Sequence, residues 1–424
     1  MENVRALALS VLEKHADAEQ YSNIALDTAI KRHPLSDADR GLLTALVYGV
    51  IERKLTLDHL ISCLSDRPLR GLDEQTKMLL RLGLYQLQYL DRVPDHAAVN
   101  ETVSLAPRRS RGFVNAVLRA HLRNEKRLTL PDAVQMPIEY LSVKYSFGKE
   151  ICERFLSVFG MERTESLLGA FNRSAPLTLR VNLLRTSRAS LLSRLREAGY
   201  AAEPTRESKD GILLPSAPVS ALPGFAEGEF FVQDEASQLC VKALDAHPGM
   251  TVLDACSCPG SKAFGAAISM QNEGRVIACD LHANKLSLVE SGALRLGISI
   301  LTTEARDARA EKAEWTQSFD RVLCDVPCSG FGVFAKKPEL RYKDPKQSEA
   351  LPGIQRAILQ NASRFLKVGG RLVYSTCTVL PEENGENIEA FLKEHPQFQC
   401  LEQRTLYPDT DGTDGFYYAV LQRN

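Results

Sequence analysis

The segment TVLDACSCPGSKAFGAAISMQNEGRVIACD, residues 251–280, decides the predicted fold of the carboxyl-terminal half of the chain. TVLDAC and GRVIACD are short apolar runs that predict buried strands. Between them, the turn at residues 256–262 joins the first strand to a helix, where Gly260 permits a close approach and free backbone N–H groups gather. A strand, a turn, a helix and a second strand in this order predict a parallel α/β sheet.

The same alternation continues to the end of the chain. Further strands are predicted in ISILTTEARDA (298–308), FDRVLCDVP (319–327) and GGRLVYSTC (369–377), and helices in residues 282–297 and 381–395. Pro381, Glu382 and Glu383 are typical of a first helical turn. The pattern indicates a doubly wound, mostly parallel sheet, in which ligands bind beyond the carboxyl ends of the strands. Strands are predicted to end at or near Asp254, Asp280, Asp307, Asp325 and Cys377.

The chain before residue 238 is of a different kind. Residues 1–130 show helical periodicity throughout, with Ser36 as an N-cap ahead of one long helix that extends to about residue 61. A proline-marked connector, LTLPDAVQMP, then leads into residues 131–237, where strands in LTLRVNLL, GILLP and GEFFVQD and a helix over 187–200 predict a small α/β layer. We therefore expect an all-α domain over 1–130, a small α/β domain over 131–237 and the main α/β core over 238–424.

The composition is that of a soluble globular protein. A length of 424 residues predicts two or three domains, and 44% hydrophobic with 25% charged residues is ordinary for such proteins. No apolar run is long enough to span a membrane, and the amino terminus is an acid-containing amphipathic helix rather than a signal peptide, so we expect a cytoplasmic protein. The ten cysteines are expected to be free thiols. CSC at 256–258 is not a CxxC pair, and we predict no metal site.

A net charge of −1 hides a basic segment, Pro107 to Arg127, which holds seven Lys or Arg and a single acid. Such a run is either a solvated helix face or a surface that contacts phosphates, and the composition alone does not separate the two. On the second interpretation the candidate RNA-binding residues are Arg108, Arg109, Arg111, Arg119 and Arg123, together with Lys336, Lys337 and Arg341 in a second basic segment.

The strand ends combine acids with thiols. Asp280 can accept hydrogen bonds from a ribose, and Asp307 can reach an adenine edge. One such acid alone is more often a solvated loop residue or a cap. Three acids at successive strand ends, Asp254, Asp280 and Asp307, favour an adenosyl cofactor. Asp325 and Cys328 lie side by side before a loop that Gly330 and Gly332 predict to be flexible, and the next strand delivers Cys377. Packing alone hardly explains two cysteines and an acid at adjacent strand ends.

Together these motifs carry a resemblance. DxCxxPGxK (254–262), DVPCSG (325–330) and YSTCTVLPEEN (374–384) resemble the RNA cytosine-5 methyltransferases. With LSDADRGLLTALVYGV, GFVNAVLR, LRVN, FVQDEAS and DGFYYAVL added, essentially the whole chain is similar to the bacterial RsmB (Sun/Fmu) family, which modifies small-subunit ribosomal RNA. The resemblance implies a NusB-like RNA-binding domain, a small RRM-like linker domain and a class I Rossmann-like core that uses S-adenosylmethionine.

The resemblance also implies roles for the site residues. Cys377 would be the nucleophile that adds to C6 of cytosine, Asp325 would bind the base, Cys328 would assist release of the C5 proton, and Lys262 would orient the methyl donor or the base. The implied cofactor-binding residues are Cys256, Ser257, Cys258, Pro259, Gly260, Ser261, Lys262, Asp280, Asp307 and Asp325. The family's usual PGGKT is PGSKA here, and the changes at Ser261 and Ala263 concern the affinity for the cofactor rather than the reaction type.

The implied partner is small-subunit ribosomal RNA, with the target cytosine flipped out or in a single strand. Nothing in the sequence demands more than a monomer. Three alternatives stay open: the same chemistry on transfer RNA, a non-catalytic RNA-binding assembly factor, and a methyltransferase acting on protein or small molecules. The second predicts the loss of Cys377 or Asp325, and both are present. The third has no use for a second thiol or for an arginine-rich helical domain.

Overall fold

The computed structural model describes residues 3–18, 22–123, 128–215 and 217–424. The chain forms two compact units, one of Met1–Arg173 with Phe334–Pro345 and the other of Ser174–Val333 with Lys346–Asn424. The division at residue 173 differs from the boundary predicted near residue 130. Among the described residues, no helix has both the length and the apolar character needed to cross a membrane.

The first unit is helical, as predicted. Its α-helices are α1 (Val4–Ala18), α2 (Ser22–Arg32), α3 (Asp37–Glu52), α4 (Lys54–Leu64), α5 (Glu74–Tyr89), α6 (Asp95–Leu105), α7 (Arg108–Arg123), α8 (Pro137–Tyr145) and α9 (Lys149–Phe171). The hydroxyl of Ser36 caps α3 by accepting a hydrogen bond from the Asp39 backbone N–H. The prediction of one long helix from Ser36 was wrong, because Arg53 leaves helical geometry and separates α3 from α4.

Helices α8 and α9 were not predicted, and they pack with a segment that returns from much later in the chain. The ring of Phe334 meets the rings of Phe147 and Phe171 edge-on, with centroids 5.0 and 4.9 Å apart. Arg341 is fully buried there and donates hydrogen bonds to Asn172 and to the carbonyl of Phe171. The prediction that Arg341 lies on an RNA-binding surface was therefore wrong, because its guanidinium is used to hold this unit together.

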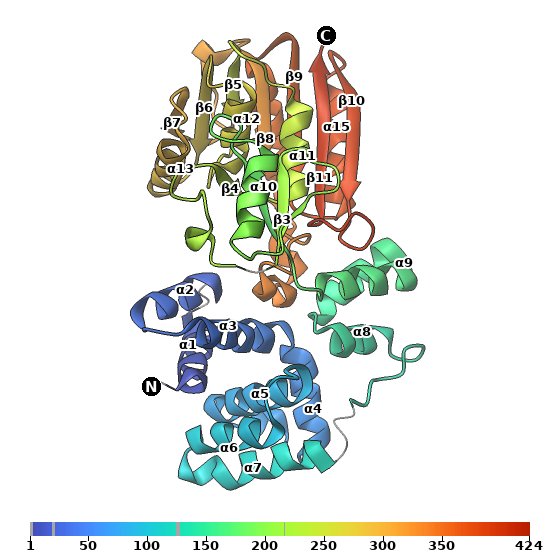
Figure 1. The fold of residues 1–424 in the computed structure, drawn as a ribbon. Helices are drawn as coiled ribbons and strands as arrows, with labels where there is room; N and C mark the ends of the chain where they lie inside the picture. The colour runs from blue at the N-terminus through green and yellow to red at the C-terminus, as the bar shows by residue number, and fades with distance from the viewer. Residues whose placement is uncertain (1–2, 19–21, 124–127, 216) are drawn as a thin grey trace. The chain divides into compact units, whose positions relative to one another are not determined.

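The second unit begins with a small α/β layer. Strands β1 (Leu177–Val181), β2 (Glu203–Pro204), β3 (Gly211–Leu214) and β4 (Phe230–Val232) form a sheet in the order β2-β3-β1-β4, with antiparallel neighbours. Helix α10 (Arg188–Glu197) covers one face of this sheet (Figure 1) and buries its apolar side against it. The predicted small α/β layer is confirmed.

The large sheet carries the core of the second unit. Its strands are β5 (Thr251–Asp254), β6 (Arg275–Asp280), β7 (Leu301–Ala305), β8 (Phe319–Asp325), β9 (Leu366–Thr376), β10 (Phe398–Leu406) and β11 (Phe416–Arg423). In the described part of the chain their order is β10-β11-β9-β8-β5-β6-β7. Neighbours from β9 to β7 are parallel, whereas β11 pairs with β9 and with β10 in antiparallel fashion. This confirms the predicted mostly parallel sheet.

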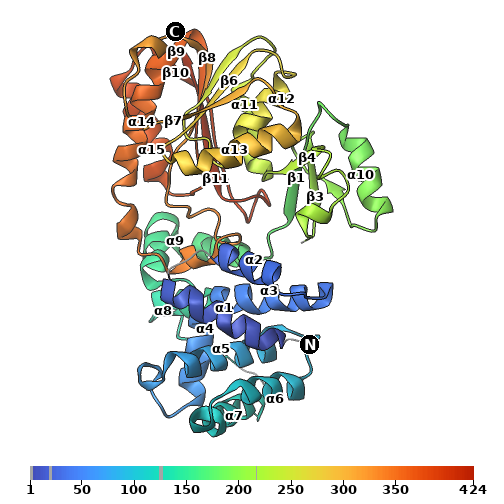
Figure 2. The ribbon, with the colours of Figure 1, turned by 90° about the vertical axis from the view of Figure 1, so that its left-hand side faces the viewer.

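Helices cover both faces of this sheet (Figure 2). On one face are α11 (Glu235–Leu244), α12 (Ser261–Ser269) and α13 (Ala283–Leu296), and on the other are α14 (Leu351–Phe365) and α15 (Gly385–Glu394). Successive strand residues alternate between the two cores, as Val252 and Leu253 do in β5. Because β5 and β8 are adjacent while their crossovers leave in opposite directions, the sheet has its switch point where their carboxyl ends lie.

The segment after Cys377 differs from the prediction. Pro381–Glu383 form a single 3₁₀ turn, and the α-helix begins only at Gly385. Glu383, expected among the acids of the first helical turn, is buried, at 2% exposed. The loop after Cys328 is also packed rather than flexible, since Gly330, Phe331 and Gly332 are all buried. The Gly332 N–H donates to the Cys377 carbonyl at 3.0 Å, so this loop and the end of β9 hold each other in place.

Candidate active site

Asp325 and Lys262 form an ion pair at the switch point of the large sheet. Asp325 ends β8, and Lys262 lies in the first turn of α12. The Lys262 ammonium lies 2.6 Å from Asp325 Oδ2, and the hydroxyl of Ser375, on the neighbouring strand β9, donates to Asp325 Oδ1 at 2.7 Å. Both carboxylate oxygens are therefore oriented by fixed donors.

The ion pair is sheltered from water. Lys262 is only 8% exposed, and its ammonium lies 5.2 Å from the centre of the Phe416 ring. Burial alone lowers the pKa of Lys262, but the charge of Asp325 and the hydrogen bond to it outweigh burial and raise that pKa above its ordinary value. The site thus holds a permanent positive charge against the Asp325 carboxylate.

The two predicted thiols meet next to this pair along the sheet edge. The sulfur atoms of Cys328 and Cys377 are 3.2 Å apart, and the Cys377 N–H donates to the Cys328 sulfur at 3.3 Å. Both side chains are half-buried. The hydrogen bond with Cys377, burial and the charge of Cys377 together raise the pKa of Cys328 well above its ordinary value. Of the two thiols, Cys328 is therefore held in its neutral form by its surroundings.

The turn after β5 is fixed by backbone hydrogen bonds. Ser257 N–H donates to the Cys279 carbonyl at 2.7 Å, and Cys258 N–H donates to Asp280 Oδ2 at 3.3 Å. Gly260 ends the turn with a φ of 104°, a left-handed conformation that favours glycine. Ser261, which follows it, is not among the residues with positive φ and begins α12. Serine in place of glycine at 261 therefore causes no backbone strain.

Asp254 is a site residue that the sequence placed only as a strand end. It is 1% exposed, and burial together with the charge of Asp325 raises its pKa to about 7. Among the described residues, Asp254 Oδ2 and Ser257 Oγ are buried without a hydrogen-bond partner. Buried polar atoms normally have partners, so these two oxygens, one at the end of β5 and one in the turn that follows, are suited to a polar ligand. A strand-end acid before a Cys-rich turn was the signal available in the sequence.

The other two predicted cofactor acids differ from each other. Asp280, at the end of β6, accepts hydrogen bonds from the N–H groups of Cys258 and His282 and is only partly buried, which leaves lone pairs for a ligand. Asp307 follows β7, and the Arg309 guanidinium donates to both of its carboxylate oxygens, at 3.0 Å to Oδ1 and 2.7 Å to Oδ2. For Asp307 to contact a ligand, this exposed ion pair would have to open or be shared.

Most of the predicted RNA-binding residues lie on surfaces of the first unit. Arg108, Arg109, Arg111, Arg119 and Arg123 are exposed on α7, as are Lys336 and Lys337 in the returning segment. Three of the arginines have local partners: Arg109 lies 4.0 Å from Asp73, Arg111 donates to the Ala106 carbonyl at 3.1 Å and Arg119 donates to Asn115 at 3.0 Å. The basic residues Lys126 and Arg127 fall outside the described residues.

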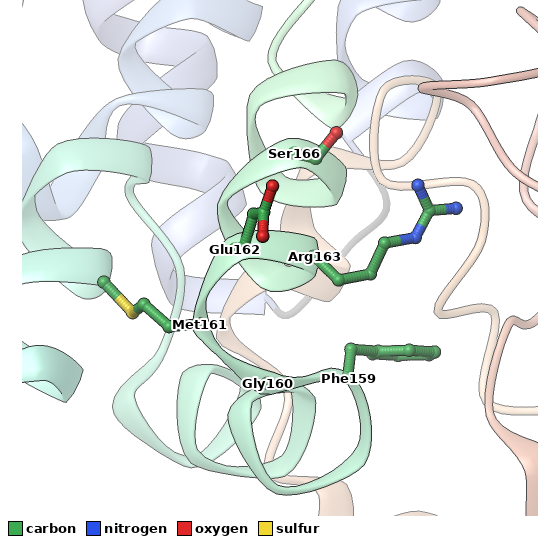
Figure 3. Close-up of a pocket in the computed structure, with 6 residues that line it drawn as sticks. All are labelled: Phe159, Gly160, Met161, Glu162, Arg163 and Ser166. Carbon is green, nitrogen blue, oxygen red and sulfur yellow. The ribbon is translucent and has the colours of Figure 1, made fainter.

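The first unit also contains a hollow of about 390 Å³ where α9 is interrupted at Gly160. It is lined by Phe159, Gly160, Met161, Glu162, Arg163 and Ser166. Figure 3 shows the side chains of Phe159 and Arg163 on the same side of the break and that of Met161 on the opposite side. None of the predicted site residues lines this hollow.

Three family models match successive regions of the chain. The family described as 16S rRNA methyltransferase RsmB/F matches residues 241–422, the NusB family matches residues 2–123, and the ferredoxin-like domain of RsmF/B-like methyltransferases matches residues 151–220. The crystal structure of PH0851 covers 100% of this chain and 99% of its own, with a TM-score of 0.82 and 25% identity.

Relatives of similar length extend the match to the whole chain. The probable ribosomal RNA small subunit methyltransferase B of Bacillus subtilis (strain 168) is 37% identical over 442 residues, with 99% of each chain covered. The protein of the same name from Synechocystis sp. is 35% identical over 445 residues and covers both chains completely. This chain therefore belongs to the RsmB/F family of 16S rRNA methyltransferases.

Proposed function

We propose that this protein methylates C5 of a cytosine in small-subunit ribosomal RNA, using S-adenosylmethionine and a covalent bond between Cys377 and C6 of the base. The observation that carries the proposal is the pair of thiols 3.2 Å apart, which have unequal surroundings and lie on the same sheet edge as the Lys262–Asp325 ion pair. Membership of the family and the names of the relatives support ribosomal RNA as the substrate.

Covalent catalysis answers a chemical problem. C5 of cytosine is a poor nucleophile, and adding the Cys377 thiolate to C6 moves the electron pair of the C5–C6 double bond to C5. When bound, S-adenosylmethionine supplies a methyl group on a positively charged sulfur. Once C5 carries that methyl group, a base must remove the proton that is still on C5. The C5–C6 double bond then re-forms, and Cys377 leaves C6 as a thiolate.

We assign the two cysteines different roles in this reaction, and the unequal surroundings of the two thiols support the assignment. In the resting pair, the hydrogen bond with Cys377 and its charge help to keep the proton on Cys328. Once Cys377 is bonded to C6 it carries no charge, and both of these effects disappear. The pKa of Cys328 then falls, and Cys328 more readily becomes the thiolate that accepts the C5 proton. Formation of the adduct therefore changes which of the two thiols more readily holds a proton.

Asp325 and Lys262 position the base. With Ser375 and Lys262 on its two oxygens, the Asp325 carboxylate is fixed where it can accept a hydrogen bond from the exocyclic amine of cytosine. The neighbouring Lys262 ammonium favours electron density that moves toward the base as Cys377 adds. Orientation of this kind lowers the barrier because the reacting atoms meet in the correct geometry.

The turn after β5 suits the cofactor. Buried oxygens of Asp254 and Ser257 lack partners among the described residues, and Asp280 retains free lone pairs at the end of the next strand. Asp280 would hold the ribose hydroxyls, and the turn Cys256–Lys262 would surround the methionine end. Ser261 begins α12 without strain, so the change from the family's usual glycine is compatible with this role.

The exposed arginines of α7 would contact phosphates of the surrounding RNA, and such contacts position the nucleic acid without reading its sequence. Since Cys377 must reach C6 from one face of the ring, the target cytosine has to leave its base stack. The same chemistry on transfer RNA is the second candidate, and the choice of RNA in the assay separates the two.

The test is transfer of labelled methyl from S-adenosylmethionine to unmodified small-subunit ribosomal RNA, with the product base located by bisulfite sequencing. Wild type is expected to methylate one cytosine, Cys377→Ala to be inactive, and Cys328→Ala to accumulate a covalent protein–RNA adduct. Full activity in Cys377→Ala would overturn the assignment of the nucleophile. Activity on transfer RNA alone would overturn the substrate and retain the chemistry.

A further inference from the structure

The peptide groups on both sides of Cys328 are clamped by two buried side chains. Glu383 Oε2 accepts a hydrogen bond from the Ser329 N–H at 2.9 Å, directly after Cys328. Gln355, on α14, donates to the Pro327 carbonyl at 3.0 Å, directly before Cys328, and to the same Glu383 oxygen at 2.8 Å. The position of Cys328 is therefore set by a carboxylate that comes from the loop following Cys377.

The clamp is itself supported by buried donors. The Tyr374 hydroxyl donates to the Glu383 carbonyl at 2.6 Å, and Asn387 Nδ2 donates to Gln355 Oε1 at 2.9 Å. Glu383, Gln355 and Asn387 are each at most 2% exposed. Buried hydrogen bonds of this kind fix one geometry, because any rearrangement leaves polar groups without partners.

A second set of bonds joins the two cysteine loops to each other. Ser329 Oγ donates to Thr378 Oγ1 at 3.0 Å, which links the residue after Cys328 to the residue after Cys377. Asn384, next to Glu383, donates to the Thr378 carbonyl at 3.0 Å. Glu383 thus lies at the centre of a network whose outer members hold both thiols.

We propose that Glu383 is a positioning residue that keeps Cys328 beside Cys377, and that the reaction uses it at the step in which the C5 proton leaves. This inference rests on the proposed function, because it places the role of Glu383 in the later steps of that reaction, removal of the C5 proton and elimination of Cys377. Glu383 touches neither substrate nor cofactor and acts through Cys328.

The charge of Glu383, like its hydrogen bonds, acts on Cys328. It contributes to the raised pKa of Cys328, after the hydrogen bond to Cys377, burial and the charge of Cys377. A thiol with a raised pKa gives a thiolate that is a stronger base once formed. Glu383 therefore favours the proton on Cys328 in the resting pair and strengthens Cys328 as the acceptor of the C5 proton.

The structure suggests two informative substitutions. Glu383→Ala removes the two hydrogen bonds that Glu383 Oε2 accepts, from the Ser329 N–H and from the Gln355 side chain. Glu383→Gln keeps them, because a single oxygen, Oε2, accepts from both donors, whereas Oε1 has no hydrogen-bond partner within the described ranges and can be replaced by the amide nitrogen. Glu386→Gln, at an exposed position on the first turn of α15, is the matched control.

The experiment measures three quantities with unmodified ribosomal RNA: labelled methyl transferred, the yield of denaturation-stable protein–RNA adduct, and the melting temperature. For Glu383→Ala we expect that the methyl group is still transferred in a single turnover and that release of the product is slowed by at least about tenfold, a part of the roughly 10²–10⁴-fold that general base catalysis contributes. The adduct should therefore accumulate. Glu383→Gln should release product faster than Glu383→Ala, and Glu386→Gln should behave as wild type.

A merely structural role predicts a different result, in which adduct, methyl transfer and melting temperature of Glu383→Ala all fall together. That result, or wild-type release by Glu383→Ala, would overturn the proposal. Cys328→Ala distinguishes failure of the role of Glu383 from failure of the proposed function. If Cys328→Ala accumulates adduct and Glu383→Ala does not, the role of Glu383 fails alone. If Cys328→Ala forms no adduct either, the proposed function fails and the role of Glu383 falls with it.

Discussion

Replacing Lys262 by methionine tests whether the Lys262–Asp325 ion pair is as sheltered as the structure indicates. Methionine keeps an unbranched, largely apolar side chain of similar length, and so it removes mainly the charge and the hydrogen bond. The Lys262 side chain is 10% exposed and that of Asp325 is 31% exposed, with 2.6 Å between the charged atoms. The substitution would leave the Asp325 carboxylate half-buried without its cation.

The expected cost follows from this geometry. Removing one partner of a fully buried pair costs about 3–5 kcal/mol, but the partial exposure of Asp325 allows water to screen its charge, so we expect about 2–3 kcal/mol. For a unit of this size, that corresponds to a melting temperature lowered by roughly 5–10 °C.

Denaturant unfolding at neutral pH measures the free energy directly, with melting temperature as a second reading. Lys367→Met provides a matched control in the same sheet, because Lys367 lies 2.7 Å from Asp320 but its side chain is 44% exposed. An exposed pair of this kind contributes about 0–1 kcal/mol. If Lys262→Met destabilised the protein no more than Lys367→Met, the reasoning about a sheltered charge pair would be refuted.

Three further predictions concern Asp254, Gly332 and Arg341. Because the pKa of Asp254 is raised to about 7, the folded protein binds this proton more tightly than the unfolded chain. The contribution of the protonated Asp254 to the free energy of unfolding is therefore fully present below about pH 4. It is lost as the pH rises through 7, and the loss is up to ~4 kcal/mol. The free energy of unfolding of wild type minus that of Asp254→Asn should therefore rise on acidification from pH 8 to 5. A difference that stays constant over this range would contradict the raised pKa of Asp254. In Gly332→Ala, the new Cβ would lie 1.9 Å from the Gly415 carbonyl oxygen and 2.9 Å from that of Cys377, so turnover should fall about 100-fold. Gly353→Ala, with no atom within 4 Å of its Cβ, is the control. Arg341→Met should lower the free energy of unfolding by about 2 kcal/mol, whereas Lys337→Ala, on an exposed side chain, should change it by less than about 0.5 kcal/mol.

The sequence predicted the sheet core well because its signals are local. Short apolar strands such as residues 319–325 end in polar or reactive residues that are uncommon in a hydrophobic core, here Asp325. The carboxyl ends of parallel strands lie at one edge of the sheet, so these residues are brought together there. The thiol pair followed from that geometry together with the family motifs. The all-α front end was equally visible, since helical periodicity and the cap at Ser36 are properties of a few consecutive residues.

Contacts between distant segments could not be predicted in the same way. Arg341 appeared to belong to a basic loop, but its guanidinium donates to groups about 170 positions earlier in the chain. Glu383 appeared to be a helix-start acid, yet its partners are Gln355 and the Ser329 N–H. Charge in a sequence predicts exposure on average, and a charged residue that is buried and paired gives no local sign of its partner.

The most direct measurement uses an RNA in which the target cytosine carries fluorine at C5. With fluorine in place of the C5 proton, release is blocked, and a covalent adduct should accumulate with wild-type protein in the presence of S-adenosylmethionine. Mass spectrometry of the digested complex should find the nucleotide attached to Cys377, and Cys377→Ala should form no adduct. Attachment at Cys328, or an adduct of equal yield in Cys377→Ala, would contradict the assignment of Cys377 as the nucleophile.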